Sequence, residues 1–288
     1  MKKSWINGKF IVLTGASSGI GRELTKILIE KHNAKVLGIA RNEEKMLKLI
    51  QELGEFKENF SFKLFDVSRN ENWIEFSKFI EKEKLNIDIL INCAGQLPAF
   101  DKFENYDLEV VENVVNVNFY SAIYSIKNLM ENIKRSEKPM IVNISSSASL
   151  CAIPGTSIYS ASKSALKAFS ESLDSETDKN MRVSLICPGF TKTDIFRNQA
   201  KESKNALIDK ISMPSDKMAR KIEKSILKRK RRAVIGIDAK LMNLLYKFFP
   251  RSAARICGWV LKKFKVDLFD NVFNEKGKEK WLRRSLIN

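Results

Sequence analysis

Residues 10–21 read Phe10-Ile-Val-Leu-Thr14-Gly15-Ala-Ser-Ser-Gly19-Ile-Gly21, an apolar run followed at once by a glycine-rich turn. The apolar run predicts a buried strand over Phe10–Thr14. Glycines suit a tight turn in which the backbone approaches a pyrophosphate closely and the next helix packs against the strand. The first turn of that helix offers free N–H groups and a positive dipole end to phosphates. The stretch therefore predicts a nucleotide site, at Thr14, Gly15, Ser17, Ser18, Gly19, Ile20 and Gly21.

Beyond this turn, short apolar runs alternate with segments of helical length. Such alternation is typical of a parallel sheet covered by helices on both faces, a doubly wound α/β fold of the Rossmann type with about seven strands. We expect one catalytic domain over residues 1–238 and a basic helical extension over 239–288. The expected strands are Phe10–Thr14, Lys35–Ala40, Ser61–Asp66, Ile87–Asn92, Met140–Ser145, Arg182–Cys187 and Ala233–Ile237.

Cysteine and histidine content narrows the function classes. The 288 residues include four scattered cysteines and one histidine, His32, so a metal site, a disulfide framework and a histidine-based triad are all disfavoured. No apolar run approaches the roughly 20 residues that span a bilayer. Because no signal peptide is recognisable at the N-terminus either, a cytoplasmic protein is expected.

A second informative stretch is Tyr159-Ser-Ala-Ser-Lys163. Positions i and i+4 share one face of a helix, so the phenol of Tyr159 and the ammonium of Lys163 can lie in one pocket. A free phenol has a pKa of about 10. A cation about 4 Å away would lower that pKa by roughly 3 units, near the working pH. The pattern therefore predicts a tyrosine that exchanges protons.

Taken together, the glycine turn, Asn92-Cys93-Ala94-Gly95, Asn118, Ser146, Tyr159 with Lys163, and Pro188-Gly189 resemble the short-chain dehydrogenase/reductase family. The resemblance covers roughly residues 8–237, with the motifs in the family's order and at its spacing. Cys93 stands where asparagine is commoner, and Ser121 where a glycine often follows; neither change removes a catalytic group.

The resemblance assigns the rest of the cofactor site. Asp66 and Val67 should flank the adenine, Asn92, Ala94 and Gly95 should line the groove, and Tyr159 and Lys163 should reach the nicotinamide ribose. The residues expected to border the carboxamide are Pro188, Gly189, Thr191 and Thr193. Arg41 ends the second expected strand, where an NAD-preferring site has a carboxylate. A guanidinium there can hold a 2′-phosphate, which favours NADP(H) over NAD(H).

The same resemblance implies four catalytic residues. Tyr159 would donate or accept the proton, Lys163 would lower its pKa, and Ser146 would donate a hydrogen bond to the carbonyl oxygen. Asn118 would support a water relay. Ser146 is chosen within Ser145-Ser146-Ser147 by its 13-residue spacing to Tyr159, and Asn118 competes with Asn116.

We expect an NADPH-dependent oxidoreductase that acts on a carbonyl or secondary alcohol of a hydrophobic, lipid-like substrate, such as a steroid, sphingoid or long-chain ketone. The alternatives are a 3-oxoacyl-thioester reductase and a non-catalytic dinucleotide-binding sensor or scaffold. Residues 190–213 occupy the position of the family's substrate lid. The expected pocket lining is Leu97, Pro98, Ala99, Phe100, Ile153, Pro154 and Phe190.

Charge is concentrated at the C-terminal end. Of the net charge of +17, residues 217–288 carry +15, from 21 Lys and Arg against 6 Asp and Glu. Ala239–Phe249 and Ser252–Phe264 are basic amphipathic segments that resemble the extensions of membrane-associated reductases of this family. They could lie on the inner face of an anionic membrane, bind an acidic carrier protein or pack on the body. Nucleic acid is not an expected partner, whereas the resemblance implies a homodimer or homotetramer.

Overall fold

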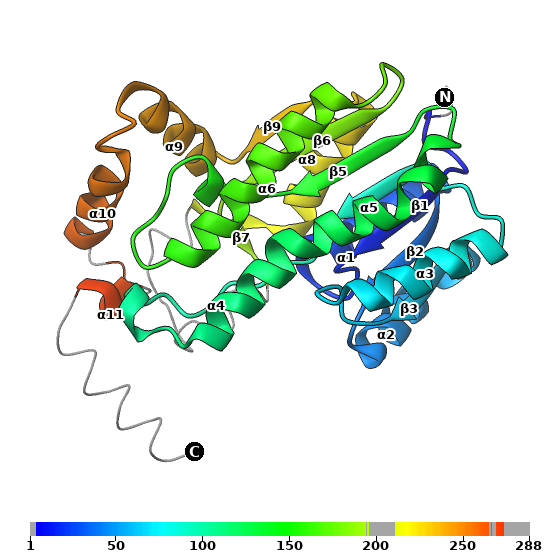
Figure 1. Cartoon of the computed structure of the whole chain (residues 1–288), viewed down its shortest axis with the longest axis horizontal. Helices are drawn as coiled ribbons and strands as arrows, with labels where there is room; N and C mark the ends of the chain where they lie inside the picture. Colours follow the sequence, from blue (N-terminus) through cyan, green and yellow to red (C-terminus); the bar gives the residue numbers. More distant parts are fainter. Residues whose placement is uncertain (1–3, 194, 196–210, 265, 267–268, 274–288) are drawn as a thin grey trace, which may run out of the picture.

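A seven-stranded parallel sheet forms the centre of the computed structural model, which describes residues 4–193, 195, 211–264, 266 and 269–273. Every neighbouring pair of strands in this sheet is parallel, and the strand order is β3-β2-β1-β4-β5-β6-β9. The expected doubly wound Rossmann-type sheet is thus confirmed (Figure 1). The strands are β1 (Phe10–Thr14), β2 (Lys35–Ala40), β3 (Phe60–Leu64), β4 (Ile89–Asn92), β5 (Met140–Ile144), β6 (Arg182–Pro188) and β9 (Arg232–Ile235).

Two of these strands, β1 and β2, have the expected bounds, and the others differ by one or two residues at one or both ends. The differences are largest at β3 and β9, each of which begins one residue before and ends two residues before its predicted bounds. Asp66 instead accepts hydrogen bonds from the backbone and hydroxyl of Ser68 and so begins a turn. A second, two-stranded sheet pairs β7 (Thr191–Lys192) with β8 (Met213–Pro214).

Three helices cover one face of the sheet. They are α1 (Gly19–His32), α2 (Glu43–Leu53) and α8 (Ser215–Leu227). Their apolar stripes meet alternate residues of the strands, as Leu24 and Leu28 of α1 and Ile222 of α8 join Ile11 and Leu13 in one buried cluster. His32 is the last residue of α1, and its Nε2 lies 2.9 Å from Glu223 Oε1 of α8. The histidine is therefore part of the packing between these two helices.

Helices on the opposite face complete the three layers (Figure 1). A buried cluster joins Trp73 of α3 and Leu129 of α5 to Val12, Leu90 and Ile141 of the sheet. Strands buried on both faces explain why the sequence shows continuous apolar runs instead of alternation. The helices of this face are α3 (Asn70–Lys82), α4 (Leu108–Val115), α5 (Ser121–Lys134) and α6 (Ser157–Glu176).

The chain direction across the sheet reverses between β1 and β4. After β3 the chain returns to the middle of the sheet and then proceeds outward through β5, β6 and β9. At such a switch point the connecting loops leave in opposite directions and open a crevice at the carboxyl ends of the strands. The glycine turn, residues 92–95, Ser146 and Pro188-Gly189 lie at these ends, whereas Asn118 lies in a helical turn and Tyr159 and Lys163 lie in α6.

The C-terminal extension folds as helices at one end of the molecule (Figure 1). It comprises α9 (Ile237–Phe248), α10 (Ala253–Lys263) and the short α11 (Asp270–Phe273). Ala239 and Ala253 are buried where α9 and α10 meet the body, and Phe269 is buried just before α11. Across the part of the chain that the structure describes, no helix is long and apolar enough to cross a membrane.

Candidate active site

A cavity of about 390 Å³ opens at the switch point and brings most of the predicted site residues together. Of the predicted set, Thr14, Asn92 and Asn118 do not line the cavity but lie buried beside it. The predicted residues that line it are Gly15, Ser17, Ser18, Gly19, Ile20, Gly21, Arg41, Asp66, Val67, Ala94, Gly95, Ser146, Tyr159, Lys163, Pro188, Gly189, Thr191 and Thr193.

The glycine turn between β1 and α1 is tightly packed. Gly15 has φ +76°, and a Cβ there would lie 3.0 Å from the Ala94 backbone. A Cβ at Gly21 would overlap the carbonyl oxygen of Gly15. The N-cap residue Ser18 makes no side-chain hydrogen bond to the first turn of α1. A phosphate group therefore fits at this turn, because glycine permits the close backbone packing and the first N–H groups of a helix have no partner within the helix.

The buried polar residues near the cavity hold its walls together. The Thr14 hydroxyl accepts hydrogen bonds from the backbone N–H groups of Cys93 and Ala94, each at 3.0 Å, and so joins β1 to the end of β4. Asn92 donates to Asn143 of β5 at 2.9 Å and accepts from Ser125 of α5 at 2.8 Å. Thr14 and Asn92 thus position the loops that line the cavity without touching it.

Ser146, Tyr159 and Lys163 meet at the end of β5. Ser146 precedes η4 (Ser147–Ser149), and its hydroxyl is close enough to the Tyr159 phenol of α6 to lower the pKa of that phenol. One helical turn after Tyr159, Lys163 donates from Nζ to the Ile144 carbonyl oxygen at 3.1 Å. Ser145 has a different role, because its hydroxyl donates to the Lys163 carbonyl oxygen at 2.9 Å. Of the three neighbouring serines, Ser146 is the one whose hydroxyl affects the pKa of Tyr159, and its catalytic role stays a prediction.

Burial governs the protonation of this group. It raises the pKa of Tyr159, and the hydrogen bond with Ser146 opposes that rise. Burial also lowers the pKa of Lys163 to about 8, with partial opposition from Cys93 and Cys187. From the sequence we expected the positive charge of Lys163 to lower the pKa of Tyr159. In this structure desolvation dominates instead, and the group acting against it is Ser146.

Asn118 lies in η3 (Asn116–Tyr120), a single π-helical turn between α4 and α5. Its amide accepts from the Gln96 N–H and donates to the Gln96 carbonyl oxygen, both at 2.8 Å, and it also donates to the Ser162 hydroxyl at 3.1 Å. Asn118 is buried whereas Asn116 is only partly so. Asn118 therefore joins the loop after β4 to α6, in the position expected of a buried supporting amide.

Arg41 stands at the carboxyl end of β2 beside the cavity, with 71% of its side chain exposed. Its guanidinium lies 4.0 Å from Asp66. Burial would raise the pKa of Asp66, but hydrogen bonds from Ser68 and the charges of Arg41 and Arg69 lower it overall. The exposed guanidinium remains in reach of a group placed against the end of β2.

The opposite end of the cavity is apolar, and the described part of the extension backs it. Phe269 stacks on Phe100 with ring centroids 4.6 Å apart, and both join a buried cluster that includes Tyr159 and Phe190. Of the expected pocket lining, Pro98, Ala99 and Pro154 do not reach the cavity; Leu97, Phe100, Ile153 and Phe190 do. Most of the expected lid, residues 194 and 196–210, lies outside the described residues, whereas Ile195 lines the cavity.

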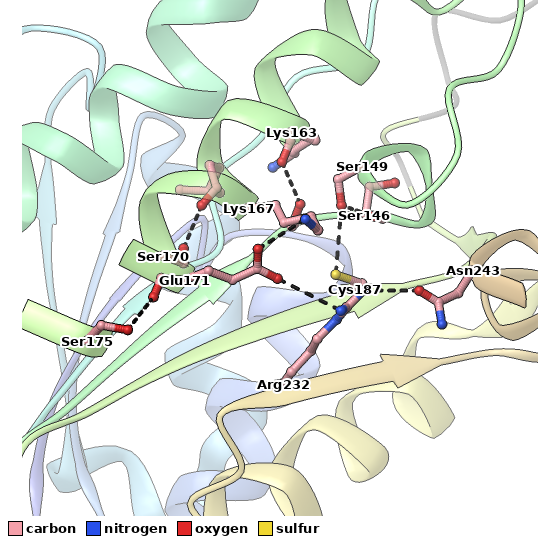
Figure 2. A network of polar contacts seen from close by, with 12 residues as sticks. Ser146, Ser149, Lys163, Lys167, Ser170, Glu171, Ser175, Cys187, Arg232 and Asn243 are labelled. Atoms are coloured by element: carbon pink, nitrogen blue, oxygen red, sulfur yellow. Dashed lines mark hydrogen bonds and ion pairs between the residues drawn. The ribbon is translucent and has the colours of Figure 1, made fainter. Parts of the chain in front are cut away.

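A polar network joins the catalytic helix to the extension (Figure 2). Glu171 of α6 pairs with Lys167 at 3.0 Å and with Arg232 of β9 at 3.9 Å, and Arg232 donates to Asn243 of α9 at 3.0 Å. A second tie is Asp238 at the start of α9, which accepts from the Phe190 N–H at 2.6 Å. The extension is therefore fastened both to α6 and to the loop after Pro188-Gly189.

Several lining residues were not predicted. Asp238 does not line the cavity but was also missed, since no local motif marks a carboxylate 48 positions away as the acceptor for the Phe190 N–H. Cys93 directly follows the predicted strand that ends at Asn92, and Gln96 lies three residues later, so their position after a strand end was a usable signal. The unpredicted lining residues are Ile39, Ala40, Phe65, Cys93, Gln96, Val117, Ile144, Ser145, Ser147, Ala148 and Thr156.

Known proteins similar to this chain include oxidoreductases. The family model described as short chain dehydrogenase matches residues 9–204. An NADPH-dependent 1-acyldihydroxyacetone phosphate reductase of Saccharomyces cerevisiae is 31% identical over 300 aligned positions, covering 94% of this chain and 96% of the relative. A 3-ketodihydrosphingosine reductase of Bos taurus is 29% identical over 248 residues, which cover 83% of this chain and 74% of the relative.

Solved structures show the same fold. A short-chain dehydrogenase from Shigella flexneri, complexed with NADP, has a TM-score of 0.72 at 22% identity, covering 81% of this chain and 97% of its own. The family model spans more than half of the chain, and the glycine turn, Ser146, Tyr159 and Lys163 lie within it. The chain therefore belongs to the short-chain dehydrogenase family and is an oxidoreductase that acts on CH–OH or C=O groups with a nicotinamide dinucleotide.

Proposed function

We propose that this oxidoreductase uses NADPH to reduce the carbonyl group of a hydrophobic, lipid-like ketone, or oxidises the matching alcohol with NADP⁺. The observation that carries the proposal is that Ser146, Tyr159 and Lys163 line one cavity. The glycine turn and the apolar wall of Leu97, Phe100 and Ile153 line the same cavity. A carbonyl carried on an apolar chain fits that arrangement.

In the proposed mechanism the bound nicotinamide supplies the hydride. Ser146 donates a hydrogen bond to the carbonyl oxygen and stabilises the negative charge that develops there. Tyr159 transfers its hydroxyl proton to the same oxygen, and its raised pKa in the structure means that it begins as the neutral acid. Lys163 holds a positive charge beside Gly95 and the cavity, which would stabilise the tyrosinate left after proton transfer.

Two observations support NADP(H) over NAD(H). The exposed guanidinium of Arg41 stands where a carboxylate would repel a 2′-phosphate. The relative from Saccharomyces cerevisiae is named as NADPH-dependent. We therefore assign the 2′-phosphate contact to Arg41.

The substrate class is supported by the cavity and by the relatives. Among the described residues, the cavity wall around Phe100, Ile153 and Phe190 carries no basic side chain that could bind a phosphate. That wall suits a long-chain or sphingoid ketone, and one relative is named as a 3-ketodihydrosphingosine reductase. A phosphate-bearing substrate, as the name of the yeast relative describes, fits this end of the cavity less well.

The decisive experiment measures NADPH consumption with a panel of carbonyl compounds. One arm contains long-chain, sphingoid and steroid ketones in mild detergent, and the other contains 3-oxoacyl thioesters. Tyr159→Phe is the matched blank, because it removes only the hydroxyl that donates the proton. We expect turnover in the first arm, a loss of roughly 100- to 10,000-fold in the variant, and NADPH binding unchanged within about twofold.

The other outcomes are equally informative. Turnover confined to the thioester arm would replace the proposal with a role in acyl-chain reduction. If neither arm gives turnover and the protein binds NADPH tightly, a dinucleotide sensor or scaffold would be favoured. Full activity of Tyr159→Phe would remove Tyr159 from the mechanism.

We further propose that residues 1–238 are the catalytic unit and that residues 239–288 hold the enzyme against an anionic membrane surface. Along α9, Ile237, Leu241, Leu244 and Phe248 recur at helical spacing, and each is more than half exposed. We call these four residues the outer stripe. Exposed basic residues that could contact anionic headgroups lie on α9, on α10 and between them, at Lys240, Lys247, Arg251, Arg255, Lys262 and Lys263.

A further inference from the structure

Two cysteines that are far apart in the sequence lie side by side between the body and the extension. The Sγ atoms of Cys151 and Cys257 are 3.6 Å apart across a sequence separation of 106 residues. Cys151 follows η4 in the loop after the catalytic Ser146, and Cys257 lies in the middle of α10. Cys151 is buried and Cys257 is partly exposed, so the pair joins the catalytic loop to the extension and can be reached from one side.

Backbone packing around the pair holds the two segments at this distance. α10 approaches the loop through Gly258, where a Cβ would lie 3.0 Å from Cγ of Pro154. In the same loop, Gly155 packs closely against the side chain of Val272, which belongs to α11 of the extension. Because these contacts do not involve sulfur, the approach of α10 to the loop does not depend on any bond between the cysteines.

We propose that Cys151 and Cys257 form a reversible disulfide that fastens α10 to the catalytic loop. A disulfide has an S–S distance of about 2.05 Å, so the two sulfurs need to approach by roughly 1.5 Å. The loop carries Ile153, which lines the cavity, and α10 leads to Phe269, which backs the wall at Phe100. The bond would therefore hold the extension closed over the apolar end of the cavity.

The oxidant is hydrogen peroxide or another small peroxide. The Cys257 thiol is the one reached first, since it is partly exposed and its hydrogen bond with Cys151 lowers its pKa. Peroxide converts this thiol to a sulfenic acid and releases one water. The Cys151 thiol then attacks that sulfur and releases a second water. Two thiols lose two electrons and two protons in total, which reduce one peroxide to two waters.

The other two cysteines are placed differently. Cys187 is buried in β6, where its sulfur lies 3.8 Å from the Ser149 hydroxyl. Cys93 lines the cofactor end of the cavity, and burial raises its pKa to about 11. Among the described residues, Cys151 and Cys257 are the two cysteines whose sulfur atoms lie within hydrogen-bonding distance of each other. We therefore expect peroxide to link this pair and to leave Cys93 and Cys187 as thiols.

The test treats the purified full-length protein with a small excess of hydrogen peroxide, blocks the remaining thiols and maps the cysteines by mass spectrometry. We expect a loss of 2 Da (two hydrogens), a linked Cys151–Cys257 peptide, and full reversal by dithiothreitol. Closing so long a loop should also raise Tm by several degrees, roughly 5 °C, in the oxidised protein. Cys257→Ser should show neither change, whereas Cys187→Ala should keep both.

These readouts do not depend on the substrate or on the proposed activity. If NADPH-dependent turnover is found, oxidation should slow it at least about fivefold in the wild type, and Cys257→Ser should be unaffected. Free thiols at both positions after peroxide treatment, or a linked pair that includes Cys93 or Cys187, would overturn the proposal. So would a disulfide that forms only between two chains or only in denaturant.

Discussion

Lys163 is a cation buried within the protein, and its burial has a thermodynamic consequence. Burial lowers its pKa from 10.5 to about 8. Between these two values the unfolded chain binds more protons at this position than the folded chain does. The free energy of unfolding therefore rises with pH from about 8 to about 10.5, and below pH 8 the cost of the buried charge is present in full. That cost is on the order of 3 kcal/mol.

Replacing this lysine should relieve the cost. We expect Lys163→Met to raise the free energy of unfolding at pH 7 by about 1–3 kcal/mol, even though it abolishes activity. Urea unfolding at pH 7, 8, 9 and 10 should show that the variant lacks the rise seen in the wild type. Lys167→Met, one turn further along α6, is the matched control and should keep the wild-type slope. An identical slope in Lys163→Met would show that the ammonium is not the titrating group.

Arg41 is the residue on which cofactor preference depends. Replacing it with aspartate exchanges a charge that attracts a 2′-phosphate for one that repels it, beside the existing carboxylate of Asp66. We expect Arg41→Asp to reduce the preference for NADPH over NADH by about 10- to 100-fold, measured as the ratio of the two dissociation constants. Arg69→Asp changes a nearby exposed charge that does not line the cavity and should alter the ratio by less than about threefold. An unchanged ratio in Arg41→Asp would assign the phosphate contact to another residue.

At the residue scale, the spacing of motifs in the sequence can select a particular serine, but it does not predict how deeply a side chain is buried or what its pKa is. The 13-residue interval to Tyr159 selected Ser146 from three serines, and the structure shows Ser145 occupied with the Lys163 carbonyl. The protonation of Tyr159 was not predictable in the same way. Its pKa depends on how much water the folded chain excludes, and that burial comes from residues distant in sequence, such as Phe269 and Val266.

At the scale of elements, continuous apolar runs located all seven strands of the main sheet, because strands buried on both faces have a distinct composition. Irregular elements had no such signal. The π-helical turn η3 places Asn118 toward Gln96 and Ser162, but one extra residue in a helix leaves the local sequence pattern unchanged. The two-residue strands β7 and β8 were likewise missed, since their pairing depends on a contact across the chain.

The segment before α11 is the element that connects the extension with the substrate. Phe269 is buried and stacks on Phe100, which lines the cavity. We expect Phe269→Ala to remove this support, raise KM for a long-chain ketone at least about tenfold, and leave the NADPH dissociation constant unchanged within about twofold. Steady-state kinetics and cofactor fluorescence measure the two quantities separately.

The matched control is Phe264→Ala, which truncates a more than half-exposed phenylalanine of the same extension. It should leave both constants near the wild-type values. Equal effects of the two variants on KM would mean that the extension acts through general stability and not through the wall at Phe100. A large change in NADPH binding by Phe269→Ala would contradict the division of the cavity into a cofactor end and a substrate end.

At the scale of the whole molecule, charge and apolar surface are distributed unevenly. Nearly all of the net positive charge belongs to residues 217–288, and the outer stripe exposes its apolar side chains along α9. The body exposes fewer large apolar groups, among them Leu108 of α4 and Tyr120 of η3. The dimer or tetramer that the family resemblance implies stays a prediction for size-exclusion measurements with light scattering.

The outer stripe predicts how the enzyme meets a membrane. Insertion of four large side chains contributes apolar burial, and each nearby Lys or Arg contributes about 1 kcal/mol against an anionic surface. We expect the protein to co-sediment with vesicles that contain phosphatidylserine, and high salt to weaken this without abolishing it. Leu244→Glu with Phe248→Glu should reduce the partition coefficient at least about tenfold while turnover of a water-soluble carbonyl stays unchanged. Leu47→Glu with Phe103→Glu replaces the same number of exposed apolar side chains of the body by glutamate, with the same change in net charge, and should have little effect. Equal binding of the stripe variant and the wild type would leave the extension with a purely structural role at the substrate wall.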